Sequence, residues 1–177
     1  MAKLSSVKLL ALDVDGVLTD GTIYIGGEGE IFKGFNAKDG MGISCALRSG
    51  LEVAIITGRT SAIIRRRAEE LGIKTVLEGV RDKAEALTKL AQGLQMTQEN
   101  IAYIGDDLND LPAFSIAGAA FAPGDAADEV CDAADIILSK AGGRGAVREA
   151  IEMILQAQDK WQAIVQGYLT CGQGDKQ

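Results

Sequence analysis

The sequence predicts an α/β fold in which helices cover both faces of a mostly parallel sheet. Short apolar runs of strand length alternate along the chain with amphipathic stretches of helical period, the pattern of parallel strands joined by crossover helices. Charged or hydroxyl-bearing motifs follow several of the apolar runs. The chain has 177 residues, enough for one well-buried domain and too few for two comfortable ones. We therefore expect a single domain over residues 1–166, folded as a Rossmann-like three-layer sandwich.

The first strand is expected at residues 8–14, where an apolar run ends in Asp13-Val14-Asp15-Gly16. Two carboxylates two residues apart suit a phosphoryl transfer in which one acid attacks phosphorus and the other handles protons. Backbone N–H groups at Asp15 and Gly16 can cradle a phosphate, because glycine allows close approach. An acidic turn after a strand is the alternative. We interpret Asp13 and Asp15 as catalytic because further motifs follow at later strand ends.

A β-hairpin is expected next, with strands at residues 22–25 and 30–35 around the glycine-rich turn at residues 26–29. On pattern alone it could be a decoration of the surface. Its aromatic and branched side chains need cover, however, and a solvent-facing apolar ribbon is usually an interface. The hairpin is therefore a candidate contact with another subunit.

A helix at residues 40–49 and a strand at residues 52–57 follow, and this strand ends in Thr57-Gly58-Arg59. The Thr57 hydroxyl can donate to phosphoryl oxygens as negative charge spreads over them in the transition state. A cap at the start of the next helix, expected at residues 61–71, is the alternative role for this threonine.

The third strand of the sheet is expected at residues 75–77 and leads to Lys83, at the start of a helix over residues 83–94. An ammonium group at a strand end can stabilise the equatorial oxygens of a transferring phosphoryl group. Taken alone, Lys83 could equally be an exposed lysine at the start of an amphipathic helix.

The next strand, at residues 101–105, ends in Gly105-Asp106-Asp107-Leu108-Asn109-Asp110. We expect Asp106 to bind Mg²⁺ together with Asp13, because this hard cation takes oxygen ligands. Asp110 stands near a helix start, and we favour a role in orienting a metal-bound water over a helix cap. For Asp107, three roles stay open: a metal ligand, a helper that orients Lys83, or a turn residue.

The remaining elements complete the alternation: a helix at residues 110–117, strands at residues 119–122 and 136–138, and a long helix from about 145 to 166. Because crossover connections are right-handed, the carboxyl ends of the strands gather at one edge of the sheet. All four charged motifs are expected there. Residues 167–177 are polar and glycine-bearing, and we expect a disordered tail.

Composition excludes several classes of function. The net charge of −7 argues against nucleic acid or an anionic membrane surface as a partner. The absence of histidine excludes a Ser-His-Asp or Cys-His mechanism and leaves proton transfer to carboxylates. The chain has no apolar stretch long enough to cross a bilayer and begins without the layout of a signal peptide, so we expect a cytoplasmic protein.

The four motifs at Asp13, Thr57, Lys83 and Asp106, in this order and spacing, resemble those of the haloacid dehalogenase-like superfamily of phosphohydrolases. The second acid, Asp15, resembles the phosphatase branch, because the dehalogenases lack it. The resemblance implies Asp13 as nucleophile, Asp15 as general acid and base, and Thr57 and Lys83 as phosphate contacts. It also implies Mg²⁺ held by Asp13, the main-chain carbonyl of Asp15, and Asp106.

A closer resemblance, to phosphatases of this superfamily that act on phosphorylated sugar acids, covers residues 7–157. It rests on four segments, at residues 12–21, 35–43, 56–59 and 142–149. The resemblance implies substrate contacts from residues that include Gly58 and the arginines, since a guanidinium matches carboxylate geometry. The candidates are Arg59, Arg67 and Arg144. Each could instead be a surface arginine, and for Arg67, in a basic run, that alternative is equally strong.

Many relatives carry a cap domain inserted after the first or the second motif, and this chain has no room for one. Between Asp20 and Thr57 only a hairpin and one helix fit, and between Thr57 and Lys83 only a helix and a strand. A capless site is open to water and short of specificity contacts. The resemblance implies a homotetramer in which the hairpin of one subunit covers the site of its neighbour.

We therefore expect a Mg²⁺-dependent phosphatase that acts on an eight-carbon 3-deoxy-2-keto sugar acid phosphate and supplies a lipopolysaccharide precursor. A nine-carbon sugar acid is the closest alternative. A non-catalytic, phosphatase-like oligomerisation module belongs to a different class, and the intact Asp13, Asp15, Lys83 and Asp106 argue against it. A phosphomutase is disfavoured, because keeping the phosphoryl group from water normally calls for a closing cap.

Overall fold

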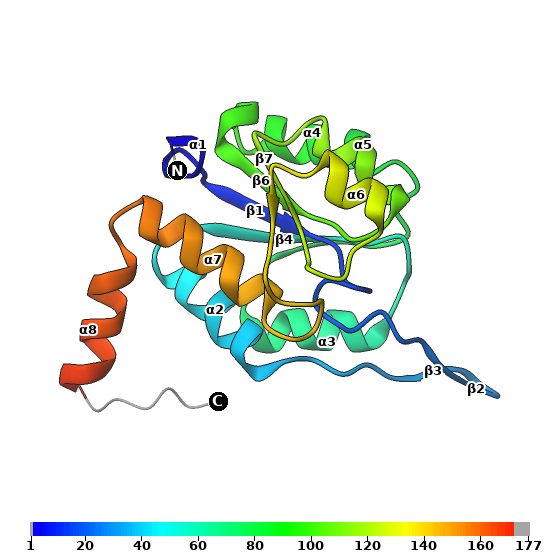
Figure 1. Ribbon diagram of the computed structural model, residues 1–177. Coiled ribbons are helices and arrows are strands. Elements are labelled where there is room, and N and C mark those ends of the chain that lie inside the picture. The colour runs from blue at the N-terminus through cyan, green and yellow to red at the C-terminus, as the bar shows by residue number, and fades with distance from the viewer. Residues whose placement is uncertain (1, 172–177) are drawn as a thin grey trace.

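The computed structural model describes residues 2–171, and its centre is a six-stranded parallel sheet in the order β5-β4-β1-β6-β7-β8 (Figure 1). The alternation of strands and helices that predicts an α/β sandwich is confirmed. The strands are β1 (Leu9–Leu12), β4 (Glu52–Ile56), β5 (Thr75–Leu77), β6 (Ile101–Ile104), β7 (Ala119–Ala122) and β8 (Ile136–Ile137). Each begins and ends within two residues of its predicted bounds.

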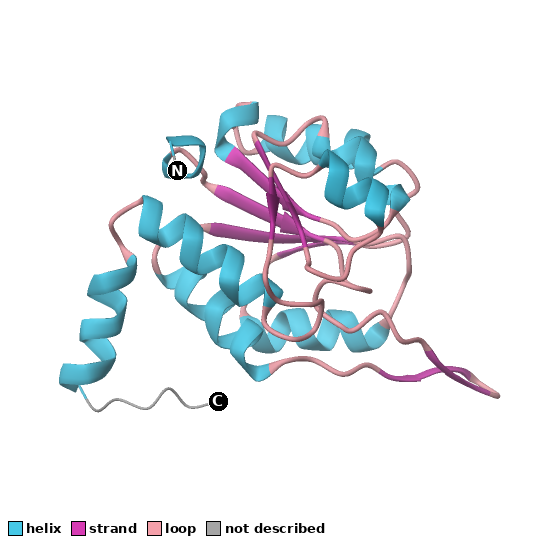
Figure 2. Ribbon diagram, in the orientation of Figure 1, coloured by secondary structure: helices cyan, strands magenta, loops and turns pink. Residues whose placement is uncertain are grey.

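Helices cover both faces of the sheet (Figure 2). One face carries α2 (Ala37–Arg48), α3 (Ala62–Leu71) and α7 (Ala146–Ala157), and the other carries α4 (Lys83–Gly93), α5 (Leu111–Phe114) and α6 (Asp128–Ala133). The short α1 (Ala2–Ser5) and the 3₁₀ turns η1 (Gln98–Asn100) and η2 (Leu108–Asp110) complete the body of the domain. Helix α6 was not predicted. Within residues 2–171, no helix is both long and apolar enough to span a bilayer.

The core is divided in two by the sheet, because side chains on a strand alternate between its faces. In β1, Leu10 and Leu12 pack with α2, α3 and α7, whereas Leu9 and Ala11 pack with α4, α5 and α6. All four residues are buried. This fully buried strand, with β4 on one side and β6 on the other, is the fixed centre from which the site is built.

The reversal of strand order beside β1 determines where a ligand can bind. The chain runs from β1 outward to β4 and β5, and then returns to β6 on the opposite side of β1. In open α/β sheets, ligands bind outside the carboxyl ends of the strands at such a reversal. The loops after β1, β4 and β6 therefore meet at one edge of the sheet, as the right-handed connections predict.

The predicted long C-terminal helix is two helices, and the break lies at Asp159. Helix α7 ends at Ala157, Asp159 has a φ of 56° in the left-handed region, and α8 (Trp161–Cys171) begins two residues later. Residues 167–171, which the sequence analysis placed in a tail, are helical. The rest of that tail, residues 172–177, lies outside the described residues.

The predicted hairpin forms from β2 (Tyr24–Gly26) and β3 (Gly29–Phe32) and projects from the domain (Figure 1). The rings of Tyr24 and Phe32 stack across it, with centroids 4.1 Å apart. Its apolar side chains face solvent, with 67% of Ile25 and 60% of Ile31 exposed. Between the first and third motifs the chain contains this hairpin, β4, β5 and two helices, and so no cap domain.

Candidate active site

Three carboxylates from two neighbouring strand ends meet at the centre of the carboxyl edge. Asp13 follows β1, Asp106 follows β6, and Asp110 ends η2 in the same loop as Asp106. One oxygen from each lies within 4.8 Å of the others, which is ligand spacing for a metal ion. Asp13 and Asp110 are buried. The expectation that separate strand ends bring acids together is confirmed.

Two oxygens of this cluster fit a cation because nothing else satisfies them. Oδ1 of Asp13 and Oδ1 of Asp106 are both buried without a hydrogen-bond partner. A buried carboxylate oxygen with no donor is costly. A hard divalent cation prefers such oxygen ligands and would offset that cost, so the residues present fit a magnesium-type site.

The pKa values of these two carboxyls reflect the same burial and the same neighbouring negative charges. Burial raises the pKa of Asp13 to about 6, against the opposing effect of the Lys83 ammonium. Burial also raises the pKa of Asp106 to about 7, with further contributions from the negative charges of Asp13 and Asp110. Without a cation, these two acids therefore take up protons at a higher pH than ordinary aspartates do.

Lys83 is a buried part of the cluster, and its interpretation as an exposed lysine is wrong. Its side chain, 1% exposed, places Nζ 3.1 Å from Oδ2 of Asp13 and 2.5 Å from Oδ1 of Asp110. The lysine begins α4 and reaches the acids from beside the sheet. Its charge offsets the two carboxylates that it contacts.

Asp110 orients its neighbours, and both of its oxygens are already engaged. Oδ1 also accepts a hydrogen bond from the Tyr103 hydroxyl at 2.8 Å, and Oδ2 accepts from the backbone N–H of Asp106 at 3.0 Å. The residue occupies the N-cap position of α5 without a side-chain bond to that helix, and Oδ2 also accepts from the backbone N–H of Asp107 in the capping box of η2. Asp110 fits a residue that positions Lys83 and the Asp106 loop. Tyr103 was not predicted.

Asp107 is a turn residue in this structure. Its side chain is exposed and accepts a hydrogen bond from the backbone N–H of Leu108 at 2.8 Å. One role considered for Asp107 was to orient Lys83. The residue that contacts Lys83 in this way is Asp110.

Thr57 stands directly after β4 and is buried. Its hydroxyl accepts a hydrogen bond from the backbone N–H of Arg59 at 3.3 Å. The cap of α3 is Ser61, which accepts from the backbone N–H of Ile64, so the helix-cap alternative for Thr57 is wrong. The threonine is therefore a buried turn residue at the carboxyl edge of the sheet.

Gly16 is a position where both the backbone conformation and the acid cluster require glycine. Its φ is +83°, and a Cβ added there would lie 1.9 Å from Oδ2 of Asp106. Any side chain would therefore displace a candidate metal ligand. Gly58 has no such constraint, since an added Cβ would meet only the carbonyl oxygen of Val80 at 3.5 Å.

Asp15 lies beside the cluster and pairs with a lysine that the sequence analysis missed. Lys33, just after β3, contacts Oδ1 of Asp15 and lies 2.8 Å from Oε1 of Glu30. Burial alone would lower the pKa of Lys33, but hydrogen bonds and charge from these two carboxylates outweigh it and raise the pKa. The only signal in the sequence was a lysine at the end of an otherwise apolar hairpin strand.

The structure brings one of the three candidate arginines to the acids. Nε of Arg59 lies 3.8 Å from Oδ2 of Asp15. Arg144 is exposed and pairs with Asp20 at 3.4 Å. Arg67 pairs with Glu70 at 3.4 Å and lines a separate hollow, of about 350 Å³, beside the hairpin base.

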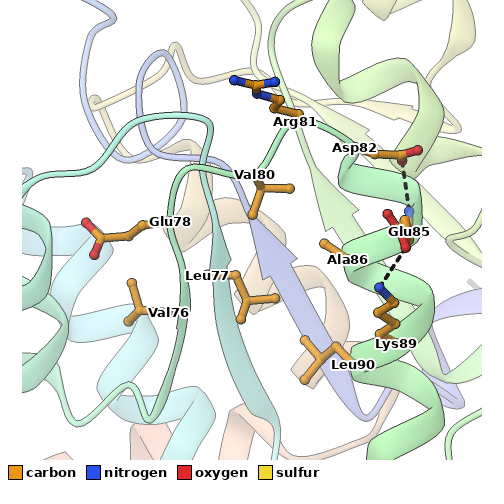
Figure 3. A pocket seen from close by; sticks show the side chains of 10 residues that line it. All are labelled: Val76, Leu77, Glu78, Val80, Arg81, Asp82, Glu85, Ala86, Lys89 and Leu90. Carbon is orange, nitrogen blue, oxygen red and sulfur yellow. Dashed lines mark hydrogen bonds and ion pairs between the residues drawn. The ribbon is translucent and has the colours of Figure 1, made fainter.

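A larger hollow, of about 620 Å³, lies between β5 and α4 and does not contain the acids (Figure 3). Apolar side chains such as Val80 and Leu90 line it. Two of its charged side chains, Lys89 and Glu85, pair with each other at 2.6 Å. We assign it no part in the site.

The chain is similar to known proteins over most of its length. A family model described as haloacid dehalogenase-like hydrolase matches residues 76–151. The chain is 48% identical over 160 residues, 90% of its length and 85% of the relative's, to the 3-deoxy-D-manno-octulosonate 8-phosphate phosphatase KdsC of Escherichia coli (strain B / BL21-DE3). It is 46% identical over 158 residues, 89% of its length and 88% of the relative's, to the protein of that name from Haemophilus influenzae.

Solved structures with that name superpose closely. The cobalt-bound Haemophilus influenzae phosphatase has a TM-score of 0.91 and 45% identity, covering 95% of this chain and 99% of its own. The Moraxella catarrhalis phosphatase, in complex with a magnesium ion, a phosphate ion and a KDO molecule, has a TM-score of 0.92 and 42% identity, covering 94% of this chain and 96% of its own.

Proposed function

From the premise that the chain belongs to the haloacid dehalogenase-like hydrolases, and among them to the family of 3-deoxy-D-manno-octulosonate 8-phosphate phosphatases, we propose that it hydrolyses this sugar acid phosphate. It is a phosphatase by family. The observation that carries the proposal is the pair of buried, unpartnered oxygens of Asp13 and Asp106 beside the buried ammonium of Lys83. That arrangement supplies a metal site and a fixed positive charge for a phosphate.

The cofactor is Mg²⁺, and the residues that would hold it are Asp13, Asp106 and the main-chain carbonyl of Asp15. The two orphaned carboxylate oxygens fit a hard cation, and the similar phosphatase from Moraxella catarrhalis contains a magnesium ion. When bound, the ion screens negative charge, so that an anionic carboxylate and a phosphate can approach each other.

In the first chemical step, one carboxylate oxygen of Asp13 attacks phosphorus while the bond from phosphorus to the sugar oxygen breaks. Asp15 donates a proton to that departing oxygen. Lys83, the Thr57 hydroxyl and the backbone N–H of Gly16 contact the phosphoryl oxygens and stabilise the charge that spreads over them. The product of this step is an aspartyl-phosphate on Asp13 and a free sugar acid.

In the second step, Asp15, now ionised, accepts a proton from a water molecule that attacks the phosphorus of the aspartyl-phosphate. The bond between phosphorus and the Asp13 oxygen breaks, which restores the Asp13 carboxylate and releases inorganic phosphate. The proton that Asp15 donates in the first step is replaced in the second step by a proton from the water molecule.

The sugar acid would be held by arginines, and the site would be completed by assembly. Arg59 is the strongest candidate for the substrate carboxylate because it already lies beside Asp15. Arg144 and Arg67 are weaker candidates, because their contacts within this chain lie elsewhere. We propose a homotetramer in which the exposed apolar hairpin covers the site of a neighbouring subunit. The proposed product is a lipopolysaccharide precursor, and the cytoplasmic location stays a prediction.

The test measures inorganic phosphate released by the purified protein, with Mg²⁺, from the eight-carbon and the nine-carbon 2-keto-3-deoxy sugar acid phosphates. The proposal predicts a clearly higher kcat/KM for the eight-carbon substrate. Comparable values for both would defeat the narrower assignment. No release from either, with Mg²⁺ present, would instead support the non-catalytic module.

A further inference from the structure

Lys33 is a buried lysine in an unexpected place, at the base of a hairpin whose large apolar side chains face solvent. Its side chain is only 1% exposed, whereas half of the neighbouring Phe32 is exposed, at 50%. Lysines are almost never fully buried unless they are paired. Lys33 is paired twice, with Asp15 and with Glu30, so its burial reflects a specific contact with the active-site loop.

The Lys33 ammonium is fixed from the side opposite Asp15. Glu30, which lies 2.8 Å from Nζ of Lys33, also accepts a hydrogen bond from the hydroxyl of Ser61. Ser61 in turn caps α3 and donates its backbone N–H to Glu78 at 2.7 Å. These contacts connect the hairpin to the body of the domain, so Lys33 is held by rigid elements and not by the hairpin alone.

The Asp15 carboxyl has few other contacts to hold it. Its second oxygen faces Nε of Arg59 at 3.8 Å, and the Arg59 side chain is 46% exposed. An exposed pair at that distance contributes little fixed geometry. Lys33 is therefore the buried group that determines where the Asp15 carboxyl points.

We propose that Lys33 is a positioning residue that holds Oδ1 of Asp15, so that Oδ2 of the same carboxyl faces the leaving oxygen and then the water. This inference rests on the proposed function, since it concerns the acid and base of that reaction. A general acid must lie within hydrogen-bond reach of the atom it protonates, and a small misplacement lowers the rate strongly. The hairpin thus has a role within its own subunit, in addition to any contact with a neighbour.

The experiment compares the wild type with Lys33→Met and Lys33→Arg, and uses two substrates that differ in their need for an acid. The sugar acid phosphate has an alkoxide leaving group that must be protonated. 4-Nitrophenyl phosphate has a leaving group that departs without protonation. Lys38→Met is the matched control, because Lys38 is exposed nearby on α2. Circular dichroism and light scattering select variants with the fold and assembly of the wild type.

For Lys33→Met we expect kcat on the sugar acid phosphate to fall by roughly 10²-fold, with KM changed by less than about threefold. On 4-nitrophenyl phosphate, the first-turnover burst of nitrophenolate should persist, because that step needs no acid. The later turnovers should slow, because the water step needs Asp15 as base. Lys33→Arg should recover kcat to within about tenfold of the wild type, since it restores a donor to Asp15.

The inference is overturned if Lys33→Met leaves kcat unchanged, if it raises KM alone, or if the burst disappears together with turnover. If Lys33→Met does not fold, Lys33→Gln, which keeps a donor without the charge, is compared in the same way. A wild type that releases no phosphate from the sugar acid ester would contradict the proposed function instead. In that case the burst on 4-nitrophenyl phosphate still reports on Lys33.

Discussion

Two lysine–aspartate pairs serve the same site from very different parts of the molecule. Lys83 belongs to the scaffold and contacts Asp13 and Asp110, whose side chains are 8% and 0% exposed. Lys33 comes from the hairpin and contacts Asp15 and Glu30, whose side chains are 19% and 16% exposed. Both lysine side chains are 1% exposed, yet the acids beside Lys33 are closer to water.

The comparison separates two tasks in phosphoryl transfer. In the proposed reaction, the acids assigned to the phosphate and the cation follow strands of the sheet, and a shift of their oxygens would destroy the metal site. Asp15, the acid proposed to exchange protons with water, is more exposed, and its buried partner comes from the hairpin beside the sheet. We therefore expect changes to the Lys83 group to affect both stability and all catalysis, and changes to the Lys33 group to affect proton transfer first.

The largest expected effect is the loss of the nucleophile. Asp13→Asn should lower phosphate release by at least about 10³-fold, because the amide cannot form the aspartyl-phosphate. Thermal melting and light scattering should find the fold and assembly intact. Asp128→Asn, at an exposed carboxylate on α6, is the matched control. Near-normal phosphate release by Asp13→Asn would remove Asp13 from the role of nucleophile.

The next largest effect tests the scaffold lysine. Lys83→Met should lower the free energy of unfolding by about 3–5 kcal/mol, because it leaves two buried carboxylates without their cation. Denaturant titration in Mg²⁺-free buffer measures this loss. Lys33→Met should cost less, since water partly screens its partners. An equal loss of stability in both variants would contradict the distinction between the two pairs.

A smaller effect is expected at Tyr103, which braces the scaffold pair through Asp110. Tyr103→Phe should lower the free energy of unfolding by about 1–2 kcal/mol, because Asp110 loses one buried donor. Its kcat should fall by less than about tenfold, since Lys83 keeps its contact with Asp110. A kcat loss as large as that of Lys83→Met would mean that the hydroxyl, and not the ammonium, controls the geometry.

The smallest effect on chemistry is expected at the tip of the hairpin. Ile25→Lys with Ile31→Lys places charges on the exposed apolar face while leaving Lys33 in place. Turnover of 4-nitrophenyl phosphate should change by less than about threefold, whereas assembly and kcat/KM on the sugar acid phosphate should fall. Size-exclusion with light scattering measures the assembly. A fully active, selective monomer would refute a site shared between subunits.

Much of this site follows from the sequence because parallel topology is restrictive. Once apolar runs and helices alternate, the carboxyl ends of β1, β4 and β6 must meet, and Asp13, Thr57 and Asp106 meet with them. The catalytic roles assigned to these residues stay predictions, as does the tetramer.

Other features depend on local rotations that residue patterns do not encode. The 3₁₀ turn η2 directs Asp110 toward Lys83 and leaves Asp107 in solvent, a choice between two aspartates three residues apart. Lys33 reaches Asp15 because the end of β3 returns to the domain. The residues around Lys33 in the sequence do not distinguish it from any other lysine in a hairpin. The break before α8 depends on one left-handed aspartate.

We expect a divalent cation to take the place of protons between Asp13 and Asp106. The pKa values of these acids are raised to about 6 and about 7, from an ordinary value of 3.8. Between the ordinary value and the raised values, the folded state binds more protons than the unfolded chain does. The free energy of unfolding of the metal-free protein therefore falls as pH rises through this window.

The most direct measurement is the rise in Tm caused by Mg²⁺, determined at about pH 5 and about pH 8 for the wild type and for Asp106→Asn. We predict a larger rise at about pH 8, where both carboxyls are ionised and the cation replaces no proton, and little rise in Asp106→Asn. An equal rise at both pH values, or an undiminished rise in the variant, would contradict a cation held by these two acids.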